Sequence, residues 1–152
     1  MTGKLKELII CGHGDTEGFH KRVTPVGEQQ MRDLATQLKE EYGITNPLLL
    51  HSWLDRAVKC ATIMHEILGG EIQCHKTLSE DAYEITEAKL IELIEQSDHE
   101  CIIIMAHGVD TEDLQKEMVP KLVGEKLPYQ HISYGRQACL INLETKESIL
   151  VG

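Results

Sequence analysis

The chain has 152 residues, of which 41% are hydrophobic and 26% are charged, a composition typical of globular proteins rather than of disordered or fibrous ones. Its 15 basic and 25 acidic side chains give a net charge of −10 at pH 7 without a clustered basic stripe, which argues against nucleic-acid binding. The length predicts a single domain over residues 1–152. No apolar run approaches the roughly 20 residues of a membrane span, so we expect a cytoplasmic protein that is not attached to a membrane.

The first half of the chain alternates between short apolar runs and longer segments of helical period. Thr24 is a suitable cap for the first helix, Pro25 fits its first turn, and Gly43 ends it. Gly69 and Gly70 end the second helix. The predicted elements, in chain order, are a strand Leu5–Cys11, a helix Pro25–Tyr42, a strand Pro47–His51, a helix Leu54–Leu68 and a strand Ile72–Cys74.

The second half continues the same alternation. It is predicted to contain an acidic connector Ser79–Glu84, a helix Thr86–Ser97, a strand Cys101–Ala106, a short helix Thr111–Val119 closed by Pro120, a loop Lys121–Gln137, and a hairpin of strands Ala138–Leu143 and Ser148–Val151. Strands alternating with helices favour an α/β fold, a three-layer α/β/α sandwich around a mostly parallel sheet.

The five cysteines are scattered and form no Cys-x-x-Cys pair, so they are expected to be reduced thiols. Most of them lie inside apolar runs, where a free cysteine behaves as a small buried hydrophobic residue. They are Cys11, Cys60, Cys74, Cys101 and Cys139.

Two histidines follow predicted strands in the same way. His13 comes just after the first strand, in Cys-Gly-His-Gly, and His107 follows the strand Cys101–Ala106, in Met-Ala-His-Gly. Ligands of open α/β sheets bind at the carboxyl ends of strands, and a glycine after each histidine lets backbone amides approach an anion. Arg56 lies in the first turn of the helix after a third strand, so these three side chains are expected to meet.

This set of residue types suits phosphoryl transfer. A neutral imidazole can attack phosphorus, a guanidinium neutralises the equatorial oxygens, and a carboxylic acid or second imidazole protonates the leaving group. One histidine at a strand end is more often a core residue. Two His-Gly pairs with a strand-end arginine favour the functional interpretation.

Four segments of the chain carry a family resemblance. They are the first-strand segment Leu8–Asp15, the helix start Val23–Gln30, the segment His51–Ala61 and the second-histidine segment Ile103–Gly108. Their order and spacing resemble those of the histidine phosphatase superfamily, with its phosphoglycerate mutase-like fold, and within it the short SixA-type phosphohistidine phosphatases. The resemblance implies a metal-independent hydrolase without a cofactor.

By this resemblance His13 is the phosphorylated nucleophile, His107 a partner in the phosphate pocket, and Arg56 a phosphate clamp. The implied reaction is hydrolysis of a phosphomonoester or protein phosphohistidine through a phosphohistidine enzyme intermediate. The implied partner is accordingly a phosphorylated small molecule or a phosphohistidine protein.

The general acid is assigned less directly. Glu80, in Leu-Ser-Glu, resembles the position from which many members of the family supply a carboxylic acid, and Asp15 and Asp110 are the other candidates. A phosphohistidine substrate reduces the demand for an acid, because its imidazole leaving group can depart already protonated.

The chain departs from the family's Arg-His-Gly hallmark, because Gly12 stands where an arginine precedes the nucleophile. An arginine contact contributes about 1.5–3 kcal/mol to phosphate binding, and arginine effects on phosphoryl-transfer rates can reach about 10³. Arg22, Arg136 and Lys21 are candidates to replace it, and Gly14 is expected in the phosphate-binding loop. Gly12 also favours an alternative function, a catalytically inactive pseudophosphatase that binds a phosphorylated ligand or protein partner.

Other kinds of site fit the sequence less well. A Cys-based phosphatase needs arginine six residues after its nucleophile, whereas Glu17 lies six residues after Cys11. Residues 12–18 have the spacing G-x-G-x-x-x-G, which is not that of a dinucleotide loop. Cys11, His13 and His107 are zinc-ligand types but lack compact ligand spacing. A phosphoglycerate-type mutase carries longer insertions than this chain can accommodate.

Overall fold

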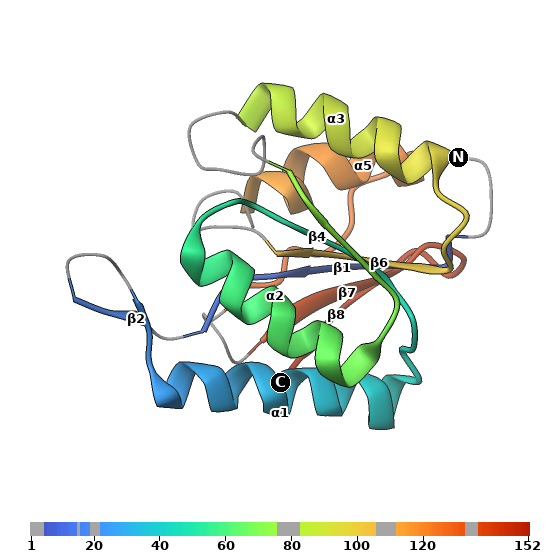
Figure 1. Ribbon diagram of the computed structural model, residues 1–152. Helices are drawn as coiled ribbons and strands as arrows, with labels where there is room; N and C mark the ends of the chain where they lie inside the picture. Colours follow the sequence, from blue (N-terminus) through green and yellow to red (C-terminus); the bar gives the residue numbers. More distant parts are fainter. Residues whose placement is uncertain (1–4, 15, 19–21, 76–82, 106–111, 133–136) are drawn as a thin grey trace.

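The computed structural model describes residues 5–14, 16–18, 22–75, 83–105, 112–132 and 137–152. A six-stranded sheet forms its middle layer (Figure 1). In spatial order the strands are β5 (Glu71–Cys74), β4 (Leu48–His51), β6 (Cys101–Met105), β1 (Glu7–Cys11), β7 (Ala138–Asn142) and β8 (Glu147–Val151).

The four strands β5, β4, β6 and β1 run parallel, and β7 and β8 form the predicted antiparallel hairpin beside β1. In the parallel register, Met105 lies opposite both Cys11 and His51, and His51 lies opposite Cys74. The parallel strands therefore end together at one side of the sheet, the carboxyl edge, where the residues that follow them converge.

Helices cover both faces of the sheet, which confirms the predicted α/β/α sandwich (Figure 1). The helices α1 (Pro25–Tyr42) and α2 (Asp55–Leu68) pack on one face, and α3 (Tyr83–Gln96), the π-helical turn η3 (Leu114–Met118) and α5 (Val119–Val123) pack on the other. Each face is apolar because strand residues alternate between the two cores. No helix in these described ranges is both long and apolar enough to cross a membrane.

The helix α1 has the predicted bounds for local chemical reasons. The Thr24 hydroxyl accepts a hydrogen bond from the Gly27 amide at 3.0 Å, which satisfies one of the first helical N–H groups. At the other end, Gly43 adopts a left-handed conformation with φ of 67°, and its amide donates to the Leu38 carbonyl.

Pro120 does not close the helix as predicted, and the loop predicted from Lys121 begins later. The Val119 amide donates to the Leu114 carbonyl across a π turn, and Pro120 then lies in the first turn of α5, which runs to Val123 before Gly124 ends it. Proline is tolerated there because the first helical turn requires no amide donor from it.

Two further boundaries differ from the prediction. The helix α3 begins at Tyr83, inside the segment predicted as an acidic connector, so Glu84 belongs to a helix rather than to a loop. A short ribbon of β2 (Thr16–Glu17) and β3 (Arg22–Val23) was not predicted, because strands of two residues are too short to show a period.

Candidate active site

His13 lies two residues beyond β1 at the carboxyl edge. Its Nδ1 atom is 2.9 Å from the Gly14 carbonyl oxygen, which can only accept a hydrogen bond. In the neutral ring the proton therefore belongs on Nδ1, and the Nε2 atom carries the lone pair. This is the tautomer that a nucleophilic imidazole needs.

Gly14 seats the His13 loop between two helices. Its amide donates a hydrogen bond to the Cys60 sulfur at 3.2 Å, in a buried contact with α2. A Cβ atom at Gly14 would lie 2.3 Å from the Gly27 carbonyl oxygen in the first turn of α1, which leaves no room for a side chain. Close packing thus explains the glycine, and a phosphate-binding role for Gly14 stays a prediction.

Arg56 lies in the first turn of α2, as predicted. The turn before it is fixed by Ser52, which is fully buried and whose hydroxyl accepts the Leu54 amide at 3.4 Å. The Nε atom of Arg56 is also buried. The unpaired amides at a helix start carry partial positive charge, so the α2 terminus adds to the field of the guanidinium.

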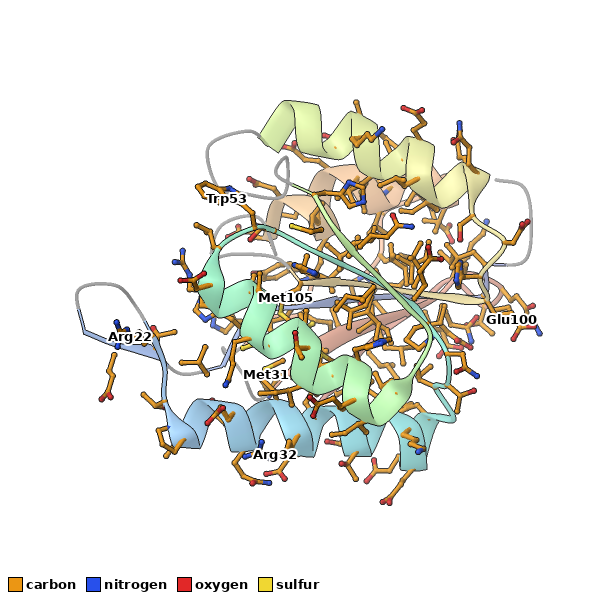
Figure 2. All side chains as sticks on the ribbon, in the orientation of Figure 1. Arg22, Met31, Arg32, Trp53, Glu100 and Met105 are labelled. Carbon is orange, nitrogen blue, oxygen red and sulfur yellow. The ribbon has the colours of Figure 1, made fainter. Side chains whose placement is uncertain are left out.

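An open pocket of about 710 Å³ lies beside Arg56. Among the described residues it is lined by Arg22, Val23, Leu54, Asp55, Arg56 and Lys59. Arg22 comes from the β2–β3 ribbon, whose strand β3 packs against α2. Figure 2 shows Arg22 on the same side of the molecule as Trp53, a residue that is 56% exposed. Two arginines and one lysine make this pocket suitable for an anion.

Lys59 is a pocket residue that sequence reasoning missed. It follows Arg56 by three residues on α2, a spacing that places both side chains on neighbouring parts of one helix surface and that could have identified it. Its ammonium lies 3.1 Å from a carboxylate oxygen of Glu28, which offsets part of its charge.

A second pocket lies near the opposite end of β1 and has a volume of about 200 Å³. Its lining includes the carboxylates of Glu7 and Glu147 together with Tyr42 and Asn142. Two carboxylates repel a phosphoryl group, so the larger pocket beside Arg56 is the better candidate for a phosphate site.

The structure supplies no reactive thiol beside His13. Burial raises the pKa of Cys11 to about 12 and that of Cys60 to about 11, so both stay protonated at neutral pH. Four of the five cysteines are buried and only Cys74 is exposed, which confirms that most of them are core residues.

Histidines also mark the ends of β4 and β5, which sequence reasoning did not single out. His51 is buried, and its Nδ1 atom donates to the Ser52 carbonyl at 2.7 Å, in the same way as His13 donates to Gly14. Burial lowers the pKa of His75, and the neighbouring charges of Lys89 and His51 lower it further. The signal was available, because each parallel strand is followed or ended by a histidine.

Several predicted site residues lie outside the described part of the chain. They are His107, Glu80 and Arg136, together with the secondary candidates Lys21, Asp15 and Asp110. Within the described ranges, no three His, Cys, Asp or Glu side chains are grouped so that they could hold a metal ion.

Comparisons with known proteins agree with the fold. The family model of the histidine phosphatase superfamily (branch 1) matches residues 3–121. No curated protein matches the chain.

Solved structures share the fold at low sequence identity. A SixA-type protein from Nakamurella multipartitia has a TM-score of 0.72 and 13% identity, over 95% of this chain and 92% of that one. The protein histidine phosphatase SixA, complexed with tungstate, has a TM-score of 0.68 and 17% identity, over 96% and 94% of the two chains. A mycobacterial glucosyl-3-phosphoglycerate phosphatase has a TM-score of 0.67 and 13% identity, over 95% and 96%.

Proposed function

This chain belongs to the histidine phosphatase superfamily, branch 1, and on that premise we propose that it hydrolyses a phosphomonoester or protein phosphohistidine through a phosphoenzyme on His13. The observation that carries the proposal is the hydrogen bond from His13 Nδ1 to the Gly14 carbonyl at 2.9 Å. It keeps the lone pair on Nε2, the atom that attacks phosphorus.

Positive charge at the same edge of the sheet as His13 supports this role. Arg56 and the start of α2 stabilise charge on the equatorial phosphoryl oxygens. Arg22 lines the same pocket as Arg56 and replaces the motif arginine, whose position in this sequence is occupied by Gly12. Arg136 stays a further candidate for this role on the resemblance alone.

The reaction proceeds in two displacements. His13 Nε2 forms a bond to phosphorus as the bond to the leaving group breaks, and Glu80 gives the leaving oxygen a proton. Water then attacks the phosphohistidine and gives a proton to the Glu80 carboxylate, the N–P bond breaks, and inorganic phosphate leaves. His107 stabilises the phosphoryl group in both steps. The roles of Glu80 and His107 rest on the family resemblance.

The size of the pocket supports a bulky leaving group. A volume of about 710 Å³ far exceeds what one phosphoryl group needs, so the site has room for a protein side chain as well as for a small ester. The comparison structures include a protein histidine phosphatase and a glucosyl-3-phosphoglycerate phosphatase, and both proteins and small phosphate esters are retained as substrate classes in the proposal.

A second function is favoured by one observation, the glycine at position 12. Without the motif arginine, the pocket could bind a phosphorylated ligand or protein partner without turning it over. The two functions differ in a covalent step, because only the phosphatase places a phosphoryl group on His13.

The experiment that tests the proposal measures turnover of p-nitrophenyl phosphate, phosphoramidate and a protein phosphorylated on histidine with phosphoramidate. His13→Ala should abolish turnover, and ³²P should be trapped on the wild type alone. His99→Ala is the matched control, since His99 precedes β6 at the opposite end of the sheet. Phosphate binding without turnover or trapped label would establish the pseudophosphatase instead.

Arg22 is tested by vanadate affinity, measured by calorimetry. Arg22→Ala should weaken vanadate binding about tenfold, the effect of losing one charge-assisted contact of about 1.5 kcal/mol. Arg32→Ala is the control, because Arg32 is exposed on α1 and points away from the sheet (Figure 2). Equal affinities in the two variants would rule Arg22 out as the replacement cation.

A further inference from the structure

The contact between Cys60 and the His13 loop is a feature that phosphate chemistry does not by itself explain. The Gly14 amide donates to the Cys60 sulfur at 3.2 Å, and Cys60 has no exposed surface. The two residues lie 46 positions apart in the chain. The hydrogen bond therefore ties the loop that carries the nucleophile to the body of α2.

The same helix presents Arg56. Cys60 follows Arg56 by four residues on α2, and residues at this spacing lie on one face of a helix. The face that holds the His13 loop is thus the face that presents the guanidinium. Figure 1 shows that α2 begins at the edge of the sheet where β1 ends, so the loop after β1 lies close enough to α2 for a direct contact.

The sulfur acts here as a neutral acceptor. Burial raises the pKa of the Cys60 thiol to about 11, although the hydrogen bond from Gly14 favours the thiolate. At neutral pH the group is therefore protonated, and the thiol itself adds no negative charge behind the proposed nucleophile. The contact stays the same over the whole pH range in which a histidine can act as a nucleophile.

The opposite side of Gly14 is also fixed, by its close approach to Gly27 of α1. The loop is thus held by packing on one side and by a hydrogen bond on the other. Packing limits how near the loop can come to α1, whereas the sulfur contact sets the position of His13 relative to α2 and Arg56.

We propose that Cys60 is a positioning residue for catalysis, which holds His13 in line with a phosphoryl group bound by Arg56. This inference rests on the proposed phosphatase function. A misplacement of about 1 Å at a reacting centre can lower a rate by about 10², so loss of the contact should act on kcat more than on KM.

The test compares Cys60→Thr with Cys60→Val, two side chains of the same shape that differ in one hydrogen-bond acceptor. We expect Cys60→Thr to keep kcat for p-nitrophenyl phosphate within about threefold of wild type, and Cys60→Val to lower it about tenfold with KM nearly unchanged. Cys101→Val is the control, because Cys101 is also a buried thiol and lies at the far end of β6. Its kcat should equal that of wild type.

A readout independent of turnover is amide hydrogen exchange at Gly14, measured by NMR. The Gly14 amide should exchange faster in Cys60→Val than in Cys60→Thr or wild type, because only Val removes its acceptor. The smaller pair Cys60→Ser and Cys60→Ala repeats the comparison without overfilling the site if the larger variants do not fold.

Two results would overturn the inference: equal kcat in the acceptor and non-acceptor variants, or equal Gly14 exchange in them. Failure of the proposed function looks different, because the wild type itself would then show no turnover. In that case the exchange comparison still decides whether the sulfur holds the loop.

Discussion

At the scale of single residues, the position of the His13 loop depends on Gly14, which has no side chain, and on Cys60, which supplies a sulfur atom. Gly14 has no space for a Cβ atom beside Gly27, while the Cys60 sulfur fills the space on the other side of the loop. His13 is therefore oriented by contacts of its neighbour's backbone, including its own hydrogen bond to the Gly14 carbonyl. The orientation of the proposed nucleophile thus depends on Gly14 and Cys60 as well as on His13 itself.

We expect Gly14→Ala to destabilise the fold by about 1–3 kcal/mol, the usual cost of overfilling a packed site. The added Cβ would lie 2.3 Å from the Gly27 carbonyl, so the loop has to move away from α1. Thermal unfolding measures the stability, and vanadate titration measures the site. An unchanged midpoint with unchanged affinity would show that the loop is not seated as described.

At the scale of elements, local signals were sufficient for most of the sandwich. The bounds of α1 follow from Thr24, Pro25 and Gly43, each of which acts within one turn of the helix. The start of α2 was predicted to within one residue, and with it the place of Arg56. His13 could be placed because apolar parallel strands end at one edge of a sheet.

The features that the sequence did not predict depend on contacts between distant segments. In the sequence alone Pro120 indicates the end of a helix, whereas the structure shows a π turn before Pro120 and a further helix, α5, that includes it. The Cys60 contact joins residues 46 positions apart, so no local pattern encodes it. Lys59 enters the pocket through the packing of α2 on the β2–β3 ribbon, and that ribbon is itself too short to have a detectable period.

The N-cap of α1 gives a prediction at this scale. Thr24→Ala removes the acceptor of the Gly27 amide and should cost about 1 kcal/mol, or about 2–4 °C in the unfolding midpoint. Thr24→Ser should retain most of the stability because it keeps the hydroxyl. Thr45→Ala, at an exposed loop position, is the control in calorimetry. A loss in the Ser variant as large as that in the Ala variant would contradict a capping role.

At the scale of the whole molecule, the charges of the surface and of the pocket have opposite signs. The net charge of −10 repels an anionic substrate at long range, whereas Arg22, Arg56 and Lys59 attract it within the pocket. Salt at physiological concentration screens the distant charges more than the near ones. Capture of a phosphate therefore depends on the local arrangement rather than on the charge of the protein.

The excess of acidic over basic side chains also affects the stability of the fold, as the carboxyl of Glu7 shows. Burial, together with the neighbouring charge of Glu100, raises the pKa of the Glu7 carboxyl. The pKa of Glu7 is therefore lower in the unfolded chain than in the folded protein, so ionisation of this carboxyl opposes folding above the raised pKa. Below the unfolded value both states are protonated and the penalty disappears.

Glu7→Gln should therefore raise the unfolding midpoint at pH 7 by about 1–3 °C, with the advantage shrinking as the pH falls towards 4. Thermal unfolding of both proteins across that range measures it. Glu125→Gln is the control for overall charge repulsion, because it changes the net charge by the same amount at an exposed loop position. A difference independent of pH would exclude the Glu7 carboxyl as its cause.

The position of β1 between β6 and β7 has a consequence for synthesis of the protein. This strand is synthesised before the other strands of its sheet, yet its two neighbours begin at Cys101 and Ala138. Until those residues have been made, the apolar run of β1 has no edge to pair with and is a target for chaperones. The part of the sheet that holds the His13 loop is thus complete only after β7 has been synthesised, and a ribosome-bound fragment that lacks β7 lacks one of the two strands that pair with β1.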